Sequence, residues 1–177
     1  LLVETALEML PAGPADVLDL GTGTGAIALA LASERSTWRL TGVDRIGEAV
    51  TLATRNAQRL GLGNVGFIES QWFSSLAGRR YGLIVSNPPY IPASDPHLLQ
   101  GDVRFEPSSA LVAGGDGLDD IRLIIAQAPT HLLSSGWLML EHGYDQAMAV
   151  RTLLFDGGFV DVASRKDFGG NERVSFG

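Results

Sequence analysis

The sequence contains no cysteine, and Lys166 is the only lysine in a chain of 177 residues. The absence of cysteine excludes disulfide bonds, thiolate-coordinated zinc and a cysteine nucleophile, and it is typical of a reducing compartment. Positive charge is also scarce, since 13 Lys and Arg residues stand against 20 Asp and Glu residues and give a formal net charge of −7. Because duplex binding requires a basic stripe, we expect no direct binding to nucleic acid.

Long apolar runs and targeting signals are missing as well. No uninterrupted apolar run is long enough to cross a bilayer, and the chain has no signal-peptide pattern, so we expect a cytoplasmic protein without membrane contact. The length fits one domain. The chain opens with Leu1-Leu2-Val3 in what reads as the middle of a helix, so we expect a fragment or an excised domain.

Histidine is scarce, with His97, His131 and His142 the only three. None of them has metal-ligand spacing to another, so we expect no metal site and interpret each as a surface or hydrogen-bonded histidine. The pair Glu141-His142 resembles a catalytic pair, but the sequence places no activated serine with it.

Apolar segments of strand length alternate with segments of helical period along most of the chain. The predicted strands cover residues 17–20, 40–43, 65–68, 83–85, 137–140, 160–163 and 173–176, and the predicted helices cover residues 1–10, 26–32, 48–60, 118–132 and 146–155. Pro129 is expected to kink its helix or end it early, because proline donates no hydrogen bond. Residues 91–117 predict a long loop. The alternation predicts an α/β fold with a mostly parallel sheet covered on both faces.

Three glycines, Gly21, Gly23 and Gly25, stand where the first predicted strand turns into a helix. Without side chains they allow a cofactor to approach the backbone, and they permit a tight turn. Asp44 ends the second predicted strand, where a carboxylate can accept both hydroxyl hydrogens of a ribose. The pattern predicts a nucleoside-containing cofactor. It does not name that cofactor, because Gly21, Gly23 and Ala26 also fit the dinucleotide fingerprint, and a plain glycine-rich turn is a further alternative.

The second motif, Asn87-Pro88-Pro89-Tyr90, directly follows the fourth predicted strand and therefore lies at the same sheet edge as the glycines. The two prolines fix two φ angles and remove two donors, which leaves the Pro88 carbonyl rigidly directed. With the Asn87 side-chain oxygen and the flat face of Tyr90, the turn offers two acceptors and an aromatic plane. This arrangement suits a planar NH2 group, such as a carboxamide or an amino-purine. The alternative is a rigid surface turn in which Asn87 bonds its own backbone.

Together these motifs resemble the protein-(glutamine) methyltransferases that modify peptide chain release factors. The resemblance rests on residues 17–25, Asp44, Trp72-Phe73, residues 85–90 and residues 102–118. It implies a doubly wound, mostly parallel seven-stranded sheet of the class I S-adenosylmethionine-dependent methyltransferase type, which is Rossmann-like. It also implies methyl transfer to the glutamine amide nitrogen in the Gly-Gly-Gln loop of release factors. The family's N-terminal helical domain is absent from residues 1–177, which we expect to form a single catalytic domain.

The resemblance also assigns roles to residues, with S-adenosylmethionine as the cofactor. The residues expected to bind the cofactor are Gly21, Thr22, Gly23, Thr24, Gly25, Asp44, Trp72 and Asn87. The residues expected to bind the substrate glutamine are Asn87, Pro88, Pro89 and Tyr90. Gln71 stands where many relatives carry an acidic residue next to the cofactor adenine, and its amide oxygen can still accept a hydrogen bond from the adenine amino group.

Asn87 and the Pro88 carbonyl are the predicted catalytic groups. An amide nitrogen is a poor nucleophile, because its lone pair is delocalised into the carbonyl. We expect the two oxygen acceptors to take the two N–H hydrogens in bonds that strengthen as the nitrogen pyramidalises in the transition state. The reaction then depends on alignment and needs neither an essential general base nor a metal.

Other functions and structural roles fit parts of the pattern. An adenine- or guanine-directed RNA or DNA methyltransferase shares turns like residues 87–90, although the negative charge argues against it. A nucleotide-binding module without catalysis fits the glycine turn alone. Trp72 is a core aromatic in the structural alternative, and Arg104 and Glu106 fit an ion pair that orders the long loop. Asp19 is expected to fix the glycine turn by accepting backbone N–H bonds.

Overall fold

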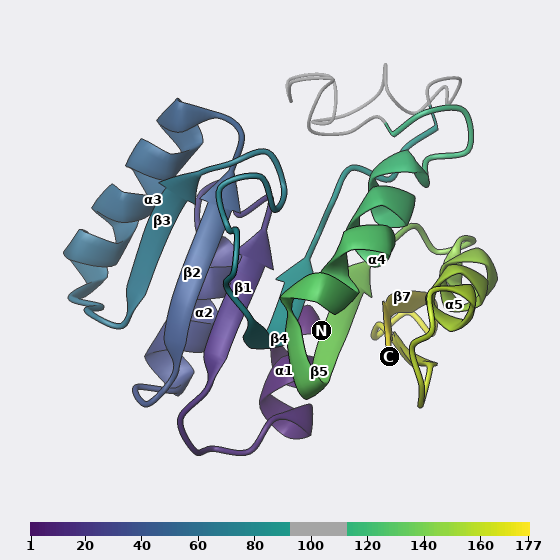
Figure 1. The fold of residues 1–177 in the computed structure, drawn as a ribbon, viewed down its shortest axis with the longest axis horizontal. Helices are drawn as coiled ribbons and strands as arrows, with labels where there is room; N and C mark the ends of the chain where they lie inside the picture. Colours follow the sequence, from purple (N-terminus) through teal and green to yellow (C-terminus); the bar gives the residue numbers. More distant parts are fainter. Residues whose placement is uncertain (93–112) are drawn as a thin grey trace.

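The computed structural model describes residues 1–92 and 113–177. In this part of the chain, seven strands form one sheet in the order β3-β2-β1-β4-β5-β7-β6 (Figure 1), and β7 runs antiparallel to both of its neighbours, β5 and β6. The strands are β1 (Asp16–Leu20), β2 (Arg39–Asp44), β3 (Val65–Glu69), β4 (Tyr81–Ser86), β5 (Leu132–Glu141), β6 (Ala163–Lys166) and β7 (Glu172–Phe176). The predicted mostly parallel, seven-stranded sheet is confirmed.

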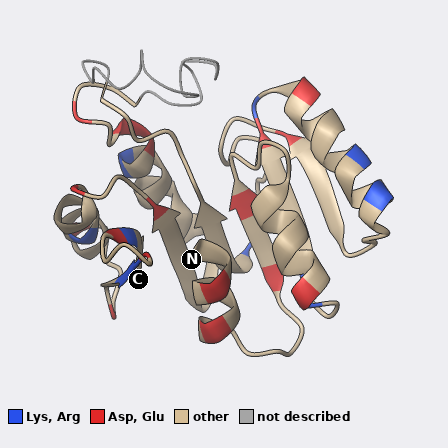
Figure 2. Ribbon diagram, turned by 180° about the vertical axis from the view of Figure 1, so that it is seen from behind, with Lys and Arg blue, Asp and Glu red and all other residues tan. Residues whose placement is uncertain are grey.

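Helices cover both faces of this sheet (Figures 1 and 2). They are α1 (Leu2–Met9), α2 (Ala26–Glu34), α3 (Gly47–Leu60), α4 (Asp119–His131) and α5 (Ala147–Asp156). On β4, Leu83 packs in one hydrophobic cluster with α1 and α2, whereas the next residue, Ile84, packs in the other with α4 and α5. Successive strand side chains point to opposite faces, so a strand buried on both faces reads as a continuous apolar run.

The order of the central strands brings three chain segments to one edge of the sheet. β1 lies between β2 and β4, and Leu20 at its end is level with Val43 of β2 and Ser86 of β4. All three strands are parallel, so the segments that follow them leave the sheet on the same side. The strand order reverses at β1, and ligands of open α/β sheets bind at such a point.

The last stretch of the chain departs from the sequence prediction. The strand predicted at residues 160–163 is present but shifted along the chain, because β6 begins at Ala163, where it pairs with Phe176. Val160 is 73% exposed and Asp161 has a φ of +53°, so the backbone turns here and does not yet pair. The sequence of residues 160–163, which includes this exposed valine, did not indicate the turn.

The segment around Pro129 also differs in its boundaries. α4 continues past Pro129 and ends at His131, one residue before the predicted end at Leu132. β5 then begins at Leu132, five residues before the predicted start at Trp137. Its first residue pairs with Tyr81, and the register shifts between Tyr81 and Leu83 before regular pairing begins. The irregular start explains why the apolar pattern marked only the second half of the strand.

Residues 93–112 lie outside the described part of the chain, and with them His97, Arg104, Glu106 and most of the predicted long loop. Among residues 1–92 and 113–177, no helix has the length and apolar character that spanning a membrane requires.

Candidate cofactor pocket and acceptor turn

The turn between β1 and α2 requires its glycines. Gly21, Gly23 and Gly25 have φ angles of +69°, +54° and +85°, in the left-handed region that residues with a Cβ rarely adopt. A Cβ on Gly25 would lie 3.1 Å from both Ala53 and the Phe67 ring, so this position packs tightly. A Cβ on Gly23 would meet no atom within 4 Å. The backbone of Gly23 is therefore open to a ligand.

Asp19 stabilises the turn between β1 and α2 through its carboxylate. Its Oδ2 accepts a hydrogen bond from the Thr22 hydroxyl at 2.6 Å and from the Ala28 backbone N–H at 3.2 Å. Its Oδ1 is buried and has no partner among the described residues. Burial raises the pKa of Asp19 from 3.8 to about 6, against the effect of these hydrogen bonds. Asp19 thus contacts the turn through the Thr22 hydroxyl, whereas the one backbone N–H from which it accepts belongs to Ala28 of α2 and not, as predicted, to the turn.

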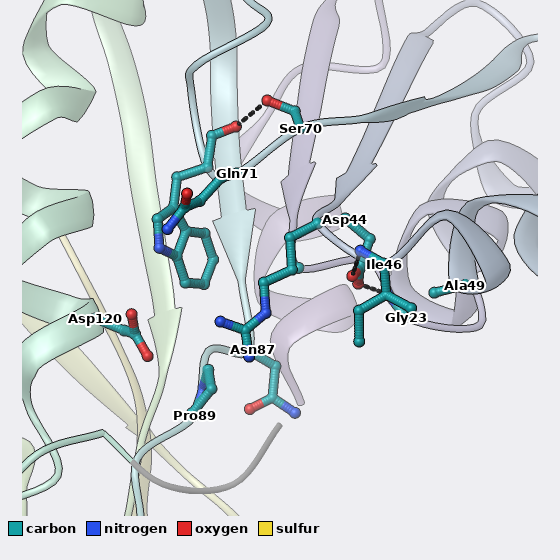
Figure 3. A pocket seen from close by; sticks show the side chains of 12 residues that line it. Gly23, Asp44, Ile46, Ala49, Ser70, Gln71, Asn87, Pro89 and Asp120 are labelled. Atoms are coloured by element: carbon teal, nitrogen blue, oxygen red, sulfur yellow. Dashed lines mark hydrogen bonds between the residues drawn. The ribbon is translucent and has the colours of Figure 1, made fainter. Parts of the chain in front are cut away.

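Asp44 joins the glycine turn to the end of β2. Its two carboxylate oxygens accept hydrogen bonds from the backbone N–H groups of Gly23, at 2.9 Å, and Ile46, at 3.0 Å (Figure 3). Each carboxylate oxygen has two lone pairs, so both retain capacity for a further donor. The position matches the predicted contact with a ribose diol, which remains a prediction.

Trp72 follows β3 with a φ of +49°, an unusual backbone conformation for a bulky residue. Ser70 holds this conformation, because its hydroxyl donates to the Trp72 carbonyl at 2.9 Å and accepts from the Ser75 N–H at 3.0 Å. Asp120, in the first turn of α4, accepts a hydrogen bond from Trp72, and burial raises the pKa of this carboxyl group. The Trp72 ring is thus fixed against the glycine turn from two sides.

Residues Asn87–Tyr90 form the acceptor turn, which begins where β4 ends beside β1. The buried Ser86 hydroxyl donates to the Leu20 carbonyl at 2.7 Å and ties the two strand ends together. Asn87 is exposed, Pro88 is buried and Tyr90 is half-buried. The Tyr90 hydroxyl accepts a hydrogen bond from Arg173 at 3.1 Å. The turn is therefore held at both ends while the Asn87 side chain remains accessible.

One cavity unites these segments, and Figure 3 shows Asn87 and Pro89 at the end opposite Ser70. The residues that line it are Gly21, Gly23, Asp44, Arg45, Ile46, Ala49, Ser70, Gln71, Trp72, Asn87, Pro89 and Asp120. Among the predicted site residues, the structure places Gly21, Gly23, Asp44, Trp72, Asn87 and Pro89 in this lining. The remaining predicted residues, Thr22, Thr24, Gly25, Pro88 and Tyr90, do not belong to it.

Sequence reasoning missed several cavity residues. Arg45 and Ile46 directly follow Asp44, and Ala49 lies in the first turn of α3, so their proximity to the predicted ribose contact was a usable signal. Ser70 precedes Gln71 in the segment after β3. Asp120 is different, because it reaches the cavity from α4 and no local pattern links it to the other residues.

His142 has a serine partner that the sequence did not reveal. Its Nε2 lies 2.7 Å from the Ser175 hydroxyl, and its Nδ1 lies 2.8 Å from the Gly143 carbonyl. Both side chains are fully buried, and burial lowers the pKa of His142. Ser175 is fully buried and therefore not an accessible nucleophile, and the interpretation of His142 as a hydrogen-bonded histidine is confirmed. The pair links β5 to β7 away from the cavity residues.

The fold and the pocket define a domain of the class I S-adenosylmethionine-dependent methyltransferase type. The structure of a ribosomal protein L11 methylase from Lactobacillus delbrueckii subsp. bulgaricus matches 99% of this chain and 76% of that chain, with a TM-score of 0.72 and 19% identity. A Thermus thermophilus 16S rRNA N2 G1207 methyltransferase, solved with AdoMet and guanosine, matches 99% of this chain and 41% of that chain, with a TM-score of 0.69 and 23% identity. These likenesses establish the fold.

Residues 2–105 match the model of the methyltransferase small domain, and the chain belongs to this family. Two curated relatives are release factor glutamine methyltransferases. The one from Pseudomonas aeruginosa is 69% identical over 177 residues, and the one from Escherichia coli K12 is 56% identical over 176 residues. The alignments cover 100% and 99% of this chain but 64% of each relative, so the chain spans less than two thirds of their length.

Proposed function

We propose that this protein transfers a methyl group from S-adenosylmethionine to the side-chain amide nitrogen of the glutamine in the Gly-Gly-Gln loop of peptide chain release factors. The observation that carries the proposal is the shared cavity: Asn87 and Pro89 of the acceptor turn line the same hollow as Gly21, Gly23 and Asp44. The high identity to two release factor glutamine methyltransferases supports this substrate over others.

The cavity residues fit the parts of the proposed cofactor. The open backbone of Gly23 suits a group that must approach the main chain, and the remaining acceptor capacity of Asp44 suits a ribose diol. Ile46, Ala49 and Trp72 supply apolar surface for a planar base. When bound, S-adenosylmethionine supplies a methyl group already activated on a sulfonium.

The acceptor turn supplies orientation and electrostatic stabilisation. Asn87 Oδ1 and the Pro88 carbonyl oxygen accept the two N–H hydrogens of the substrate carboxamide and hold its nitrogen toward the cavity. These hydrogens become more acidic as the nitrogen loses its planarity, so the two hydrogen bonds are strongest in the transition state. Pro88 and Pro89 fix the direction of the acceptors before substrate arrives, which lowers the entropy lost on alignment.

Charge supports a protein substrate over a nucleic acid. The formal net charge is −7, and the basic residues of the described chain are distributed over helices, strands and the segments between them (Figure 2). Counterion release from a nucleic acid requires several basic groups along one surface. In this function residues 1–177 form one catalytic domain, and the protein acts in the cytoplasm together with release factors.

Methylation of a purified release factor tests the proposal. The protein is incubated with S-adenosylmethionine and either the release factor or its variant with alanine in place of the loop glutamine, and the modified residue is located by peptide mass spectrometry. We expect one methyl group on the loop glutamine and none on the variant. Equal incorporation into both factors, or incorporation only into added RNA or DNA, would contradict the assignment.

A further inference from the structure

The Gln146 side chain links the end of the acceptor turn to the chain beyond residue 112. Its Nε2 donates to the Tyr90 carbonyl at 2.9 Å and to the Asp116 carbonyl at 3.2 Å. Its Oε1 accepts the backbone N–H of Gly143 at 2.8 Å. The side chain is only 8% exposed, so it is held in one position by three hydrogen bonds.

Arg173 holds the same tyrosine by its other end. Its Nη2 donates to the Tyr90 hydroxyl at 3.1 Å, and its guanidinium carbon lies 5.5 Å from the centroid of the Tyr90 ring. This geometry combines a hydrogen bond with a cation–π contact. Arg173 belongs to β7, and β7 pairs with β5 in the sheet. These contacts therefore fix the Tyr90 ring relative to β7 and the sheet.

We propose that Gln146 and Arg173 are positioning residues for the methyl transfer proposed above, on which this inference rests. Gln146 fixes the Tyr90 backbone and Arg173 fixes its ring. Two prolines stand between Tyr90 and Asn87, so little rotational freedom separates the clamped residue from the acceptor oxygens. Fixing Tyr90 therefore fixes the direction of the Asn87 and Pro88 acceptors.

The contacts of Gln146 and Arg173 with Tyr90 are called the clamp below. The hydrogen bonds of Gln146 in this clamp require an amide at position 146. The carboxamide donates two hydrogens to two carbonyl oxygens and accepts one from an N–H, which a carboxylate of the same shape cannot do because it has no hydrogen to donate. A Gln146→Glu substitution sets a negative charge against the carbonyls of Tyr90 and Asp116. A misplacement of about 1 Å at a reacting group lowers turnover by about 100-fold, which sets the scale of the expected effect.

Gln146→Glu tests the clamp, with Gln127→Glu as a matched control that makes the same charge change at an exposed position of α4. We expect kcat on release factor to fall by about 100-fold in Gln146→Glu, with S-adenosylhomocysteine affinity within about threefold of wild type. The control should change neither quantity. Normal kcat in Gln146→Glu, or a loss of S-adenosylhomocysteine binding as large as the loss of kcat, would overturn the proposal.

Arg173 provides a second test if Gln146→Glu does not fold. Arg173→Gln and Tyr90→Phe should each lower kcat, and the double variant should be no slower than the slower single variant, because both changes remove the same hydrogen bond. Fully multiplicative losses would overturn the link between Arg173 and the Tyr90 hydroxyl.

A readout without catalysis separates this inference from the proposed function. Order parameters of the Asn87 backbone amide, measured by NMR, should fall from the rigid range near 0.85 toward about 0.6 in Arg173→Gln and Gln146→Glu. If wild-type protein does not methylate release factor but Asn87 becomes mobile in these variants, the substrate assignment fails and the clamp stands. Unchanged order parameters with a working wild-type enzyme would refute the clamp alone.

Discussion

The indole ring of Trp72 lies over the backbone of Gly21. A Cβ built on Gly21 would lie 3.4 Å from ring atom Cζ3 and 3.7 Å from Cη2. This contact joins the turn after β1 to the segment after β3 and forms one wall of the cavity. The wall depends on two backbones in the left-handed region, since Gly21 has a φ of +69° and Trp72 a φ of +49°.

Gly21→Ala should weaken cofactor binding. A residue with a Cβ in the left-handed region carries strain of about 1–3 kcal/mol, and the new methyl group would occupy space beside the Trp72 ring, in the wall of the cavity. We expect S-adenosylhomocysteine affinity, measured by calorimetry, to fall about tenfold or more. Gly63→Ala is the control, since a Cβ there meets no atom within 4 Å and its φ is not positive. Equal affinities in the two variants would show that the glycine turn does not contact the cofactor.

Asp19 should make folding stability depend on pH. Its pKa is about 6 in the folded protein and 3.8 ordinarily, so between pH 4 and pH 6 the folded state binds more protons than the unfolded state. Stability from this group is therefore greatest below pH 4 and is lost as the pH rises through 6. The free energy of unfolding of wild type, relative to Asp19→Asn, should fall by on the order of 2–3 kcal/mol across this range. Parallel urea-denaturation profiles for the two proteins would contradict a raised pKa.

Gly117 should tolerate no side chain. Its φ is +75°, and a Cβ at this position would overlap the Tyr90 carbonyl oxygen and lie 2.8 Å from Gln146 Nε2. Gly117→Ala must therefore either move the acceptor turn or break the Gln146 clamp, and we expect a loss of about 2–4 kcal/mol in the free energy of unfolding. Gly115→Ala, where a Cβ meets no atom within 4 Å, should cost less than about 0.5 kcal/mol. Thermal denaturation of both variants makes the comparison, and similar losses would refute the steric explanation.

Local sequence patterns predicted the fold well, because buried parallel strands are apolar runs bounded by turn residues. β1, with the glycines after it, and β4, with Asn-Pro-Pro-Tyr after it, were visible for this reason. The boundaries of β5 and β6 were not, because the register shift beside Tyr81 and the turn at Asp161 arise from pairing with other strands. Such pairing leaves no periodic signal in the segment itself.

The cavity was predictable where its residues follow a strand directly. Asn87 does so after β4, Asp44 is the last residue of β2, and the parallel sheet brings the two together. Asp120, Gln146 and Arg173 contact the site from α4, the start of α5 and β7, through contacts that depend on the packing of helices and on strand pairing. The partnership of His142 with Ser175 has the same origin, since the two residues meet only because β5 pairs with β7.

Asn87 tests the central claim most directly. In Asn87→Ala the substrate carboxamide loses one of its two oxygen partners, while Gly23, Asp44 and Trp72 of the cavity are unchanged. Removing one such electrostatic contact lowers turnover by about 100- to 1,000-fold. Single-turnover methylation of release factor should therefore fall by at least this factor, while the affinity for S-adenosylhomocysteine changes by about threefold or less. Near-normal methylation by Asn87→Ala would contradict the account.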